Sequence, residues 1–472
     1  MSTTEVQLCS RCKTEPSVTV SRKEPFCSQC FIRFITGKQR KAMAAEKFKI
    51  QFSKDPKKEH ILFPCSFGAS SLVLLDILLC LMNEQNSNPR GQVGFHLSVV
   101  YLDDSSFEKH DTVITDVINA VKEKYQTQNL PVTFEVVDMD GFFEDSENLR
   151  KISVNLDDYQ THIQPLSQSE HSFALSQLLQ ALPNRASRHD ILQIVKAQLI
   201  QSHIIKSYNS SDSDSETPIS TVLYAHNMTT MANEVLSLTV KGRGAEIHKL
   251  LTDSVLTLPI SSTQTAQLGI LHPLKDITST EIQTYLTLLS LTELELKHKN
   301  QPTLMNKQKT INEIVNEYYK DVDVDHTGNI ISTVVSTGGK LGDPLTLKKN
   351  DGSNESSTEQ CIICHTSING NPSPDKWLSA ISYTSKLPPL TDLQKQSYSE
   401  WVESCKPSVN EENHEPPSQD QNQTQAQTGK LCYGCIVTVG GVKKADQDGF
   451  VWPVVTKERY DVDDVLKEFS LD

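Results

Sequence analysis

Eight of the eleven cysteines in this 472-residue chain fall into four C-x-x-C pairs. The pairs are Cys9/Cys12, Cys27/Cys30, Cys361/Cys364 and Cys432/Cys435. In a reducing compartment, cysteines at this spacing are more often metal ligands than disulfides. The chemistry that the sequence offers most clearly is therefore coordination of metal ions by thiolates.

The two N-terminal pairs have the spacing of a single zinc site. Fourteen residues separate Cys12 from Cys27, so a short hairpin can bring four sulfurs to one ion, each at about 2.3 Å. A site with four protein ligands is structural, because it leaves no open position for catalysis. An iron–sulfur cluster, a redox pair and the absence of any metal are the alternatives that the spacing leaves open.

The two C-terminal pairs are farther apart, because 67 residues lie between Cys364 and Cys432. Loop-closure entropy grows only with the logarithm of length, so this spacer costs about 1.4 kcal/mol more than the N-terminal one. Zinc binding to thiolates can supply on the order of 10 kcal/mol. We expect a second four-cysteine zinc site. His365 in place of one cysteine, and two unrelated pairs, stay as alternatives.

Three cysteines remain, namely Cys65, Cys80 and Cys405. Cys80 lies in an apolar run, so we interpret it as a small core residue. Cys65 ends an expected strand, where a lone cysteine is more often packed than nucleophilic.

The turn over residues 66–71 (SFGASS) is a second candidate for chemistry. A small, hydroxyl-rich turn that leads into a helix offers backbone N–H groups to a phosphate. This signal is weak alone, since any serine-capped helix has a similar sequence. The candidate phosphate-binding residues are Ser66, Gly68, Ser70 and Ser71.

Strand and helix patterns alternate around this turn, which predicts a doubly wound parallel sheet of the α/β class. The expected strands are Ile61 to Cys65, Leu97 to Leu102, Val132 to Val137 and Thr221 to Ala225. The expected helices are Ser70 to Asn83, Asp111 to Tyr125, Phe173 to Ala181, Ile191 to Ile205 and Met231 to Val240.

We divide the chain into five regions. They are an N-terminal cysteine unit (1–35), a basic helix (36–59, with its helical core from Gly37 to Phe52), the α/β domain (60–345), a linker (346–360) and a C-terminal zinc-ribbon-like unit (361–472). Three segments are poor in apolar residues and are expected to be disordered. They are 209–217, 349–359 and 407–429.

The formal net charge of −14 argues against a protein that coats nucleic acid through bulk charge. A local basic stripe could still bind RNA, and a solvated helix face is the alternative. The candidate RNA contacts are Arg33, Lys38, Arg40, Lys41 and Lys47. No apolar run reaches the roughly 18 residues of a membrane span, and the N-terminus has no signal-peptide pattern. We therefore expect a cytoplasmic protein without membrane contact.

Several segments together carry a resemblance to a known family. Residues 66–71 align with the PP-loop motif S-G-G-x-[DST]-S. The other motifs are Y-L-D-D-S at 101–105, A-H-N-M-T-T at 225–230 with Glu234, K-G-R-G at 241–244 and H-P-L-K-D at 272–276. With its two cysteine units, the chain resembles the cytoplasmic tRNA 2-thiolation protein 2 family from Cys9 to Asp472.

This resemblance implies a PP-loop (HUP-like) fold and a task. Together with its catalytic paralogue, cytoplasmic tRNA 2-thiolation protein 1, the family makes the 2-thiouridine at the wobble position of the tRNAs for lysine, glutamate and glutamine. The sulfur arrives as a thiocarboxylate on a ubiquitin-related modifier. In active members of the fold, ATP adenylates the uracil oxygen with release of pyrophosphate, and sulfur then displaces AMP.

The sequence departs from the active pattern in three places. Phe67 replaces a loop glycine, where a side chain obstructs the approach of a phosphate and restricts φ. Thr229 and Thr230 replace paired acids that help to hold Mg²⁺. Residues 182–190 (LPNRASRHD) lack the C-x-x-C of active relatives. We therefore predict a non-catalytic, tRNA-binding partner with no catalytic residues, two structural zinc ions, and ATP only through the partner subunit.

Two hypotheses from other classes stay open. In the first, the chain is an adenylating thiouridylase with an unusual loop. In the second, it is a zinc-bearing protein adaptor without tRNA contact. Exchange of pyrophosphate into ATP by the purified protein would identify the first. Crosslinking of RNA to the basic stripe would exclude the second.

Overall fold

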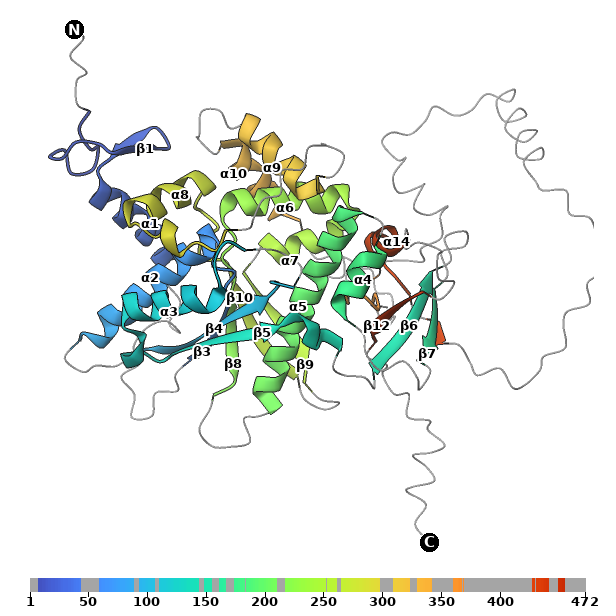
Figure 1. Cartoon of the computed structure of the whole chain (residues 1–472). Coiled ribbons are helices and arrows are strands. Elements are labelled where there is room, and N and C mark those ends of the chain that lie inside the picture. The colour runs from blue at the N-terminus through green and yellow to red at the C-terminus, as the bar shows by residue number, and fades with distance from the viewer. Residues whose placement is uncertain are drawn as a thin grey trace, which may run out of the picture.

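The structure is a computed structural model of the 472-residue chain (Figure 1). It describes residues 7–43, 59–88, 93–106, 110–143, 148–154, 161–166, 174–182, 184–209, 217–251, 253–260, 265–297, 309–322, 329–341, 360–366, 368, 427–428, 430–440 and 449–454.

A six-stranded sheet with the order β5-β4-β3-β8-β10-β9 forms the centre of the molecule (Figure 1). Its strands are β3 (Glu59–Pro64), β4 (Phe95–Asp103), β5 (Val132–Asp138), β8 (Ile219–Leu223), β9 (Ser254–Pro259) and β10 (Thr265–Leu271). Neighbouring strands are parallel except for the edge strand β9, which runs antiparallel to β10. The predicted doubly wound sheet is confirmed. Its switch point lies between β3 and β8, where ligands bind in folds of this type.

Helices cover both faces of this sheet, because successive strand residues point to opposite sides. On β3, Ile61 and Phe63 join one core and Leu62 joins another. The first core contains side chains of α1 (Ser28–Ala42), α2 (Ala69–Asn86), α3 (Ile114–Tyr125) and α8 (Ser279–Leu288). The second contains side chains of α5 (Arg185–Asn209).

Helix α2 is buried along most of its length, which explains its apolar sequence. Asp76 lies inside this helix at 6% exposure. Its carboxylate accepts hydrogen bonds from the hydroxyls of Tyr125 and Tyr285, so the buried polar group is satisfied. The interpretation of Cys80 as a core residue was wrong. Cys80 is exposed, because it lies on the solvent face of α2 one turn before Glu84.

The basic helix begins earlier than predicted. Helix α1 spans Ser28–Ala42, so it starts inside the cysteine unit and not at Gly37. The reason is a buried stripe at four-residue spacing, Phe31, Ile35 and Gln39, which packs against the body of the protein. Residues 44–58, which include the rest of the predicted helix, lie outside the described part of the chain.

A pair of helices extends α6 (Met228–Val240) in a way that the sequence did not indicate. They are α9 (Ile311–Val322) and α10 (Asn329–Gly338). Tyr319 and Ile331 pack with Met228 and Ala232 in a small separate core. None of the described helices combines the length and hydropathy that crossing a bilayer requires.

A second, antiparallel sheet joins the C-terminal segments to the middle of the chain. Its order is β11-β7-β6-β12, with β6 (Leu149–Val154), β7 (Thr161–Pro165), β11 (Gln427–Thr428) and β12 (Phe450–Pro453). Side chains of this sheet share one core with η3 (Met139–Phe143), α4 (Leu175–Ala181), the first half of α5 and α14 (Tyr433–Val439). Trp452 lies completely buried in it.

This second core bears on two predictions from the sequence. The boundary at residue 361 stays a prediction, although the C-terminal segments pack on the α/β domain through strand pairs. Of the segments expected to be disordered, the described residues include Asn209 at the end of α5, Thr217, and the short strand β11. The rest of those segments lies outside the described residues.

Candidate functional site

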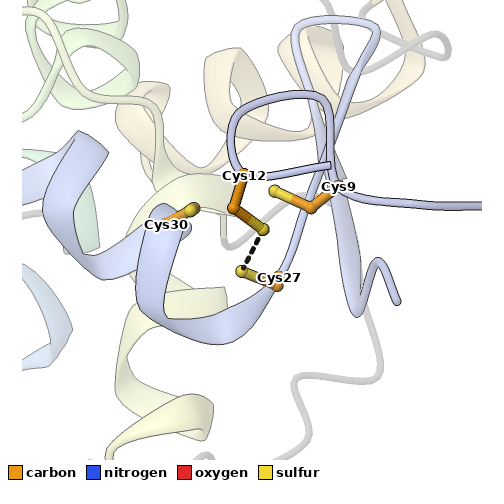
Figure 2. A group of neighbouring side chains, drawn as sticks. All are labelled: Cys9, Cys12, Cys27 and Cys30. Carbon is orange, nitrogen blue, oxygen red and sulfur yellow. Dashed lines mark hydrogen bonds between the residues drawn. The ribbon is translucent and has the colours of Figure 1, made fainter. Parts of the chain in front are cut away.

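The N-terminal cysteines converge on one point (Figure 2). Cys9 and Cys12 lie on the turn before β1 (Thr19–Ser21), while Cys27 caps α1 after β2 (Glu24–Phe26) and Cys30 lies in the first turn of that helix. All four Sγ atoms lie within 4.8 Å of one another. The Cys12 and Cys27 Sγ atoms are 3.8 Å apart, and sulfurs around a tetrahedral zinc are also about 3.8 Å apart. The site therefore fits a single metal ion.

The C-terminal cysteines form a second group, although their pairs are distant in the sequence. The four Sγ atoms again lie within 4.8 Å of one another, and the Cys364 and Cys432 Sγ atoms are 3.5 Å apart. Cys361 and Cys435 are completely buried. His365 does not belong to the group. The structure thus brings the two pairs together into one centre that could hold a metal ion.

Glu281 connects the N-terminal cysteine unit to the body of the protein. This carboxylate lies on α8, is 4% exposed, and completes a capping box with Thr278. It accepts a hydrogen bond from Ser21 Oγ at 2.8 Å and forms ion pairs with Arg22 Nε at 3.0 Å and Lys38 Nζ at 3.4 Å. Two of the three donors belong to the β1–β2 hairpin and the third to α1. Glu281 thus links both the β1–β2 hairpin and α1 to α8.

Of the five predicted RNA contacts, two form ion pairs within the protein, two are exposed, and one lies outside the described residues. Lys38 is directed to Glu281 and also donates to the carbonyl of Asp276 at 3.2 Å. Arg40 donates to both carboxylate oxygens of Glu84, at 2.8 and 2.6 Å. Arg33 and Lys41 lie on the exposed face of α1. Lys47 is outside the described residues.

The turn after β3 has the backbone that a glycine would favour, although Phe67 occupies the position. Its φ is +52°, a left-handed conformation that costs a non-glycine residue about 1 kcal/mol or more. The ring is completely buried and faces Tyr101, with 6.0 Å between the ring centroids. The turn is retained because the Phe67 side chain is accommodated in the core. That this side chain obstructs the approach of a phosphate stays a prediction.

The hydroxyl groups of this turn bond to one another and to the loop after β8. Ser66 and Ser71 hydroxyls are 3.1 Å apart, and Ser71 Oγ donates to the carbonyl of Gly68 at 3.0 Å. Asn227 Nδ2 donates to Ser70 Oγ at 2.7 Å across the switch point. The same asparagine caps α6, because its Oδ1 accepts from the Thr230 backbone N–H at 2.9 Å.

The acids beside the switch point also have partners within the protein. Asp104, at the end of β4, accepts from His110 Nε2 at 2.7 Å and pairs with Lys196 Nζ of α5 at 2.9 Å. Burial acts to raise the pKa of Asp104, but Lys196 and His110 outweigh it, so the pKa lies below its usual value. Glu234 Oε1 accepts from Asn312 Nδ2 of α9 at 2.7 Å. Lys196 and Asn312 lie 92 and 78 residues away from the acids that they contact, so no local pattern in the sequence indicates these pairs.

His226, in the A-H-N motif, packs together with two other rings. Its ring centroid is 5.6 Å from that of Tyr224 and 5.7 Å from that of His272, and both pairs are stacked. Burial lowers the pKa of His226 to about 4, so the imidazole is neutral at pH 7. Cys65, directly before the turn, is 2% exposed, and burial raises its pKa to about 12. The prediction that Cys65 is a packed residue is confirmed.

Comparison with known proteins gives a consistent result. A family model described as cytoplasmic tRNA 2-thiolation protein 2 matches residues 310–437. The protein of that name from Debaryomyces hansenii is 31% identical over 467 residues, covering 98% of this chain and 95% of that protein. The one from Kluyveromyces lactis is 32% identical over 467 residues, covering 92% and 93%.

Among solved structures, the chain is similar to the U34-tRNA thiolase NcsA from Methanococcus maripaludis with its 4Fe-4S cluster. The sequence identity is 14%, the TM-score is 0.46, and the match covers 81% of this chain and 97% of that one.

Proposed function

Because the chain belongs to the cytoplasmic tRNA 2-thiolation protein 2 family, we propose that it is a subunit of the cytoplasmic complex that 2-thiolates the wobble uridine of the tRNAs for lysine, glutamate and glutamine. Its heterodimer partner is the catalytic paralogue, cytoplasmic tRNA 2-thiolation protein 1, and the sulfur comes from a thiocarboxylated ubiquitin-related modifier. The match over nearly the full length of both relatives supports this assignment.

We propose further that this subunit is not catalytic. The observation that carries this proposal is the hydrogen bonding at the switch point. Ser66 and Ser71 face each other, Ser70 bonds to Asn227, and Thr229 Oγ1 accepts from the Ser279 backbone N–H at 3.1 Å. Groups that would bind phosphate or Mg²⁺ in an active site are engaged with one another. ATP then acts only through the partner subunit.

The distribution of thiols supports the same conclusion. The sequence has no cysteine between Cys80 and Cys361, and Cys65 is a buried, protonated thiol at neutral pH. A thiol must be ionised and accessible to receive sulfur. The described part of the α/β domain offers no such group beside the turn.

Replacement of Ser66, Ser70 and Ser71 by alanine tests the non-catalytic role. We expect thiolation to fall by less than about threefold, whereas loss of a transition-state donor from a catalytic loop costs roughly 3 to 4 kcal/mol. Thiolated tRNA is measured in cells by its retardation on a mercury-containing gel. If the variant folds, binds its partner and tRNA, and yet abolishes thiolation, the loop is catalytic.

We propose that both cysteine centres hold structural zinc. Four thiolates are the preferred ligands of such a site, and in each group the four sulfur atoms lie within 4.8 Å of one another. Elemental analysis should find about two zinc ions per chain. Iron together with a visible absorption band would contradict the proposal.

The exposed part of α1 is the proposed tRNA contact. Reversing the charge of Arg33 and Lys41 should weaken tRNA binding by the heterodimer and lower the slope of log K against log salt by about 1 to 2, because fewer counterions are released. Lys122 and Lys124, which are exposed on α3, provide a control with the same change of net charge. Equal effects of both double variants would show that α1 is only a solvated helix face.

A further inference from the structure

The turn after α6, residues 241–244 (KGRG), packs directly against the C-terminal cysteine centre. Arg243 is 7% exposed. Its Nη2 lies 3.5 Å from Cys435 Sγ and 3.4 Å from Thr438 Oγ1, and its Nη1 lies 3.4 Å from Glu246 Oε1. The guanidinium therefore touches a thiol of the centre from a segment that is 192 residues away in the sequence.

Two glycines allow the turn at residues 241–244 and helix α14 to pack closely against each other. Gly242 has a φ of +70°, and a Cβ added there would lie 2.5 Å from Cδ1 of Tyr433. A Cβ added to Gly434 would lie 2.6 Å from Cγ of Arg243. Each glycine lets a side chain of the other segment approach its backbone, so any larger residue would push the turn and α14 apart. The position of Arg243 is thus fixed by the backbone on both sides.

The negative charge of the metal centre explains why the contact with Arg243 is favourable. A divalent ion with four thiolate ligands carries a net charge of −2, and burying such a charge is costly unless it is paired. Arg243 supplies a positive charge and an N–H group that can donate to a thiolate. Glu246 orients the guanidinium, and its Oε1 accepts in turn from Thr366 Oγ1 at 3.2 Å, on the segment that carries Cys364.

The N-terminal centre lacks such a partner among the described residues. Arg11, which precedes Cys12, is exposed, and its side chain pairs with Glu24 at 3.1 Å. The N-terminal centre is also less enclosed by apolar side chains, since only Cys30 of its four ligands packs against a hydrophobic core, whereas all four ligands of the C-terminal centre lie in or against one. A charged centre within an apolar core gains little stabilisation from water, so it needs a counter-charge from the protein.

We propose that Arg243 is a positioning residue of the C-terminal metal centre, where it donates a hydrogen bond to the metal-bound thiolate of Cys435 and offsets the negative charge of the four ligands. This inference rests on the proposal that the centre holds zinc. It assigns a task to the K-G-R-G motif, which neither the fold nor the proposed tRNA contact explains.

Zinc release from the full-length protein tests the inference. We compare Arg243→Met, which removes the charge and the donors, with Arg243→Lys, which keeps the charge, and with Arg11→Met as a matched control. Each change is also made in a Cys27→Ser/Cys30→Ser background, so that only the C-terminal centre contributes to the signal. Release to a colorimetric chelator should become about 10- to 100-fold faster in Arg243→Met. Arg243→Lys should lie between Arg243→Met and the parent protein.

Cobalt substitution separates positioning from a general loss of packing. Loss of a hydrogen bond to a thiolate raises the energy of the sulfur electrons, so the thiolate-to-cobalt charge-transfer band should move to longer wavelength in Arg243→Met and recover in part in Arg243→Lys. Unchanged zinc release, or faster release with an unmoved band, would overturn the inference. If Arg243→Met does not fold, the same two outcomes are read from Arg243→Lys. If the parent centre binds no zinc at all, the zinc proposal itself fails.

Discussion

The two cysteine centres use the same four ligands in opposite structural settings. The N-terminal centre is local, because all four ligands lie within the 22 residues from Cys9 to Cys30. It rests on the body of the protein through α1 and the contacts of Glu281. The C-terminal centre joins two distant segments and lies within a core that includes β6, α4 and half of α5. In Figure 1 the two units lie on opposite sides of the large sheet.

This difference predicts different roles for the metals. An ion in the N-terminal centre stabilises a small unit that could open while the sheet stays intact. An ion in the C-terminal centre closes a loop of 67 residues and completes a core that the α/β domain shares. The free energy of metal binding contributes to the free energy of folding in both cases. Only loss of the C-terminal ion, however, should destabilise the α/β domain.

The largest effect is expected from replacing Cys432 and Cys435 by serine. Loss of the zinc ion removes on the order of 10 kcal/mol of binding free energy, which is comparable to the whole stability of a typical domain. Amides of β6 and of the first half of α5 should lose protection at least 100-fold in hydrogen-exchange mass spectrometry. Unchanged protection of β6 would mean that the C-terminal unit is an independent ribbon.

A smaller and more local effect is expected from Cys27→Ser/Cys30→Ser. The protein should lose one of two zinc ions, and exchange should increase in residues 7–36 while β3 and β4 stay protected. The physical reason is that the N-terminal ligands close only a short loop. Elemental analysis and hydrogen exchange measure both results. Loss of protection in β4 as large as in the Cys432/Cys435 variant would remove the distinction between the centres.

Glu281→Gln should detach the N-terminal unit without removing its metal. We expect a cost of about 1 to 3 kcal/mol, because Arg22 and Lys38 lose a charged partner that is itself buried. Limited proteolysis of the β1–β2 hairpin measures this local opening. An unchanged cleavage rate, with zinc retained, would show that apolar contacts alone hold the unit.

The pH dependence of that contact follows from Glu281. Burial acts to raise its pKa, but Lys38, the Thr278 backbone N–H and Arg22 lower it on balance. A carboxylate with a lowered pKa contributes its full stabilisation above its ordinary value of about 4.3 and loses it as the pH falls further. The difference in cleavage rate between the parent protein and Glu281→Gln should therefore be constant from pH 6 to pH 8.

The smallest effect is expected from Arg11→Met. Its ion pair with Glu24 is about half exposed on both sides, and such pairs contribute about 0 to 1 kcal/mol. Zinc release from the N-terminal centre should change by less than about twofold. A change as large as that expected for Arg243→Met would mean that both centres depend equally on a neighbouring arginine.

The sequence alone was sufficient where the relevant residues are close together in the chain. The spacing of Cys9, Cys12, Cys27 and Cys30 predicted one centre, because a hairpin of that length limits how far its ends can separate. The alternation of apolar runs predicted the parallel sheet, since period and length distinguish strands from helices. The buried state of Cys65 followed from its position at the end of an apolar strand.

The pairing of the distant C-terminal cysteines was also predicted, because their C-x-x-C spacing is itself a local signal, but tertiary structure decided the other contacts between segments far apart in the sequence. The second sheet pairs β6 with β12 across about 300 residues, and no local pattern encodes that register. Composition marked Lys38 as a possible RNA contact, but its ammonium group pairs with Glu281, and Arg243 meets Cys435. A charged side chain looks the same in the sequence whether it faces solvent or a buried partner, and only the packing of distant segments decides between the two.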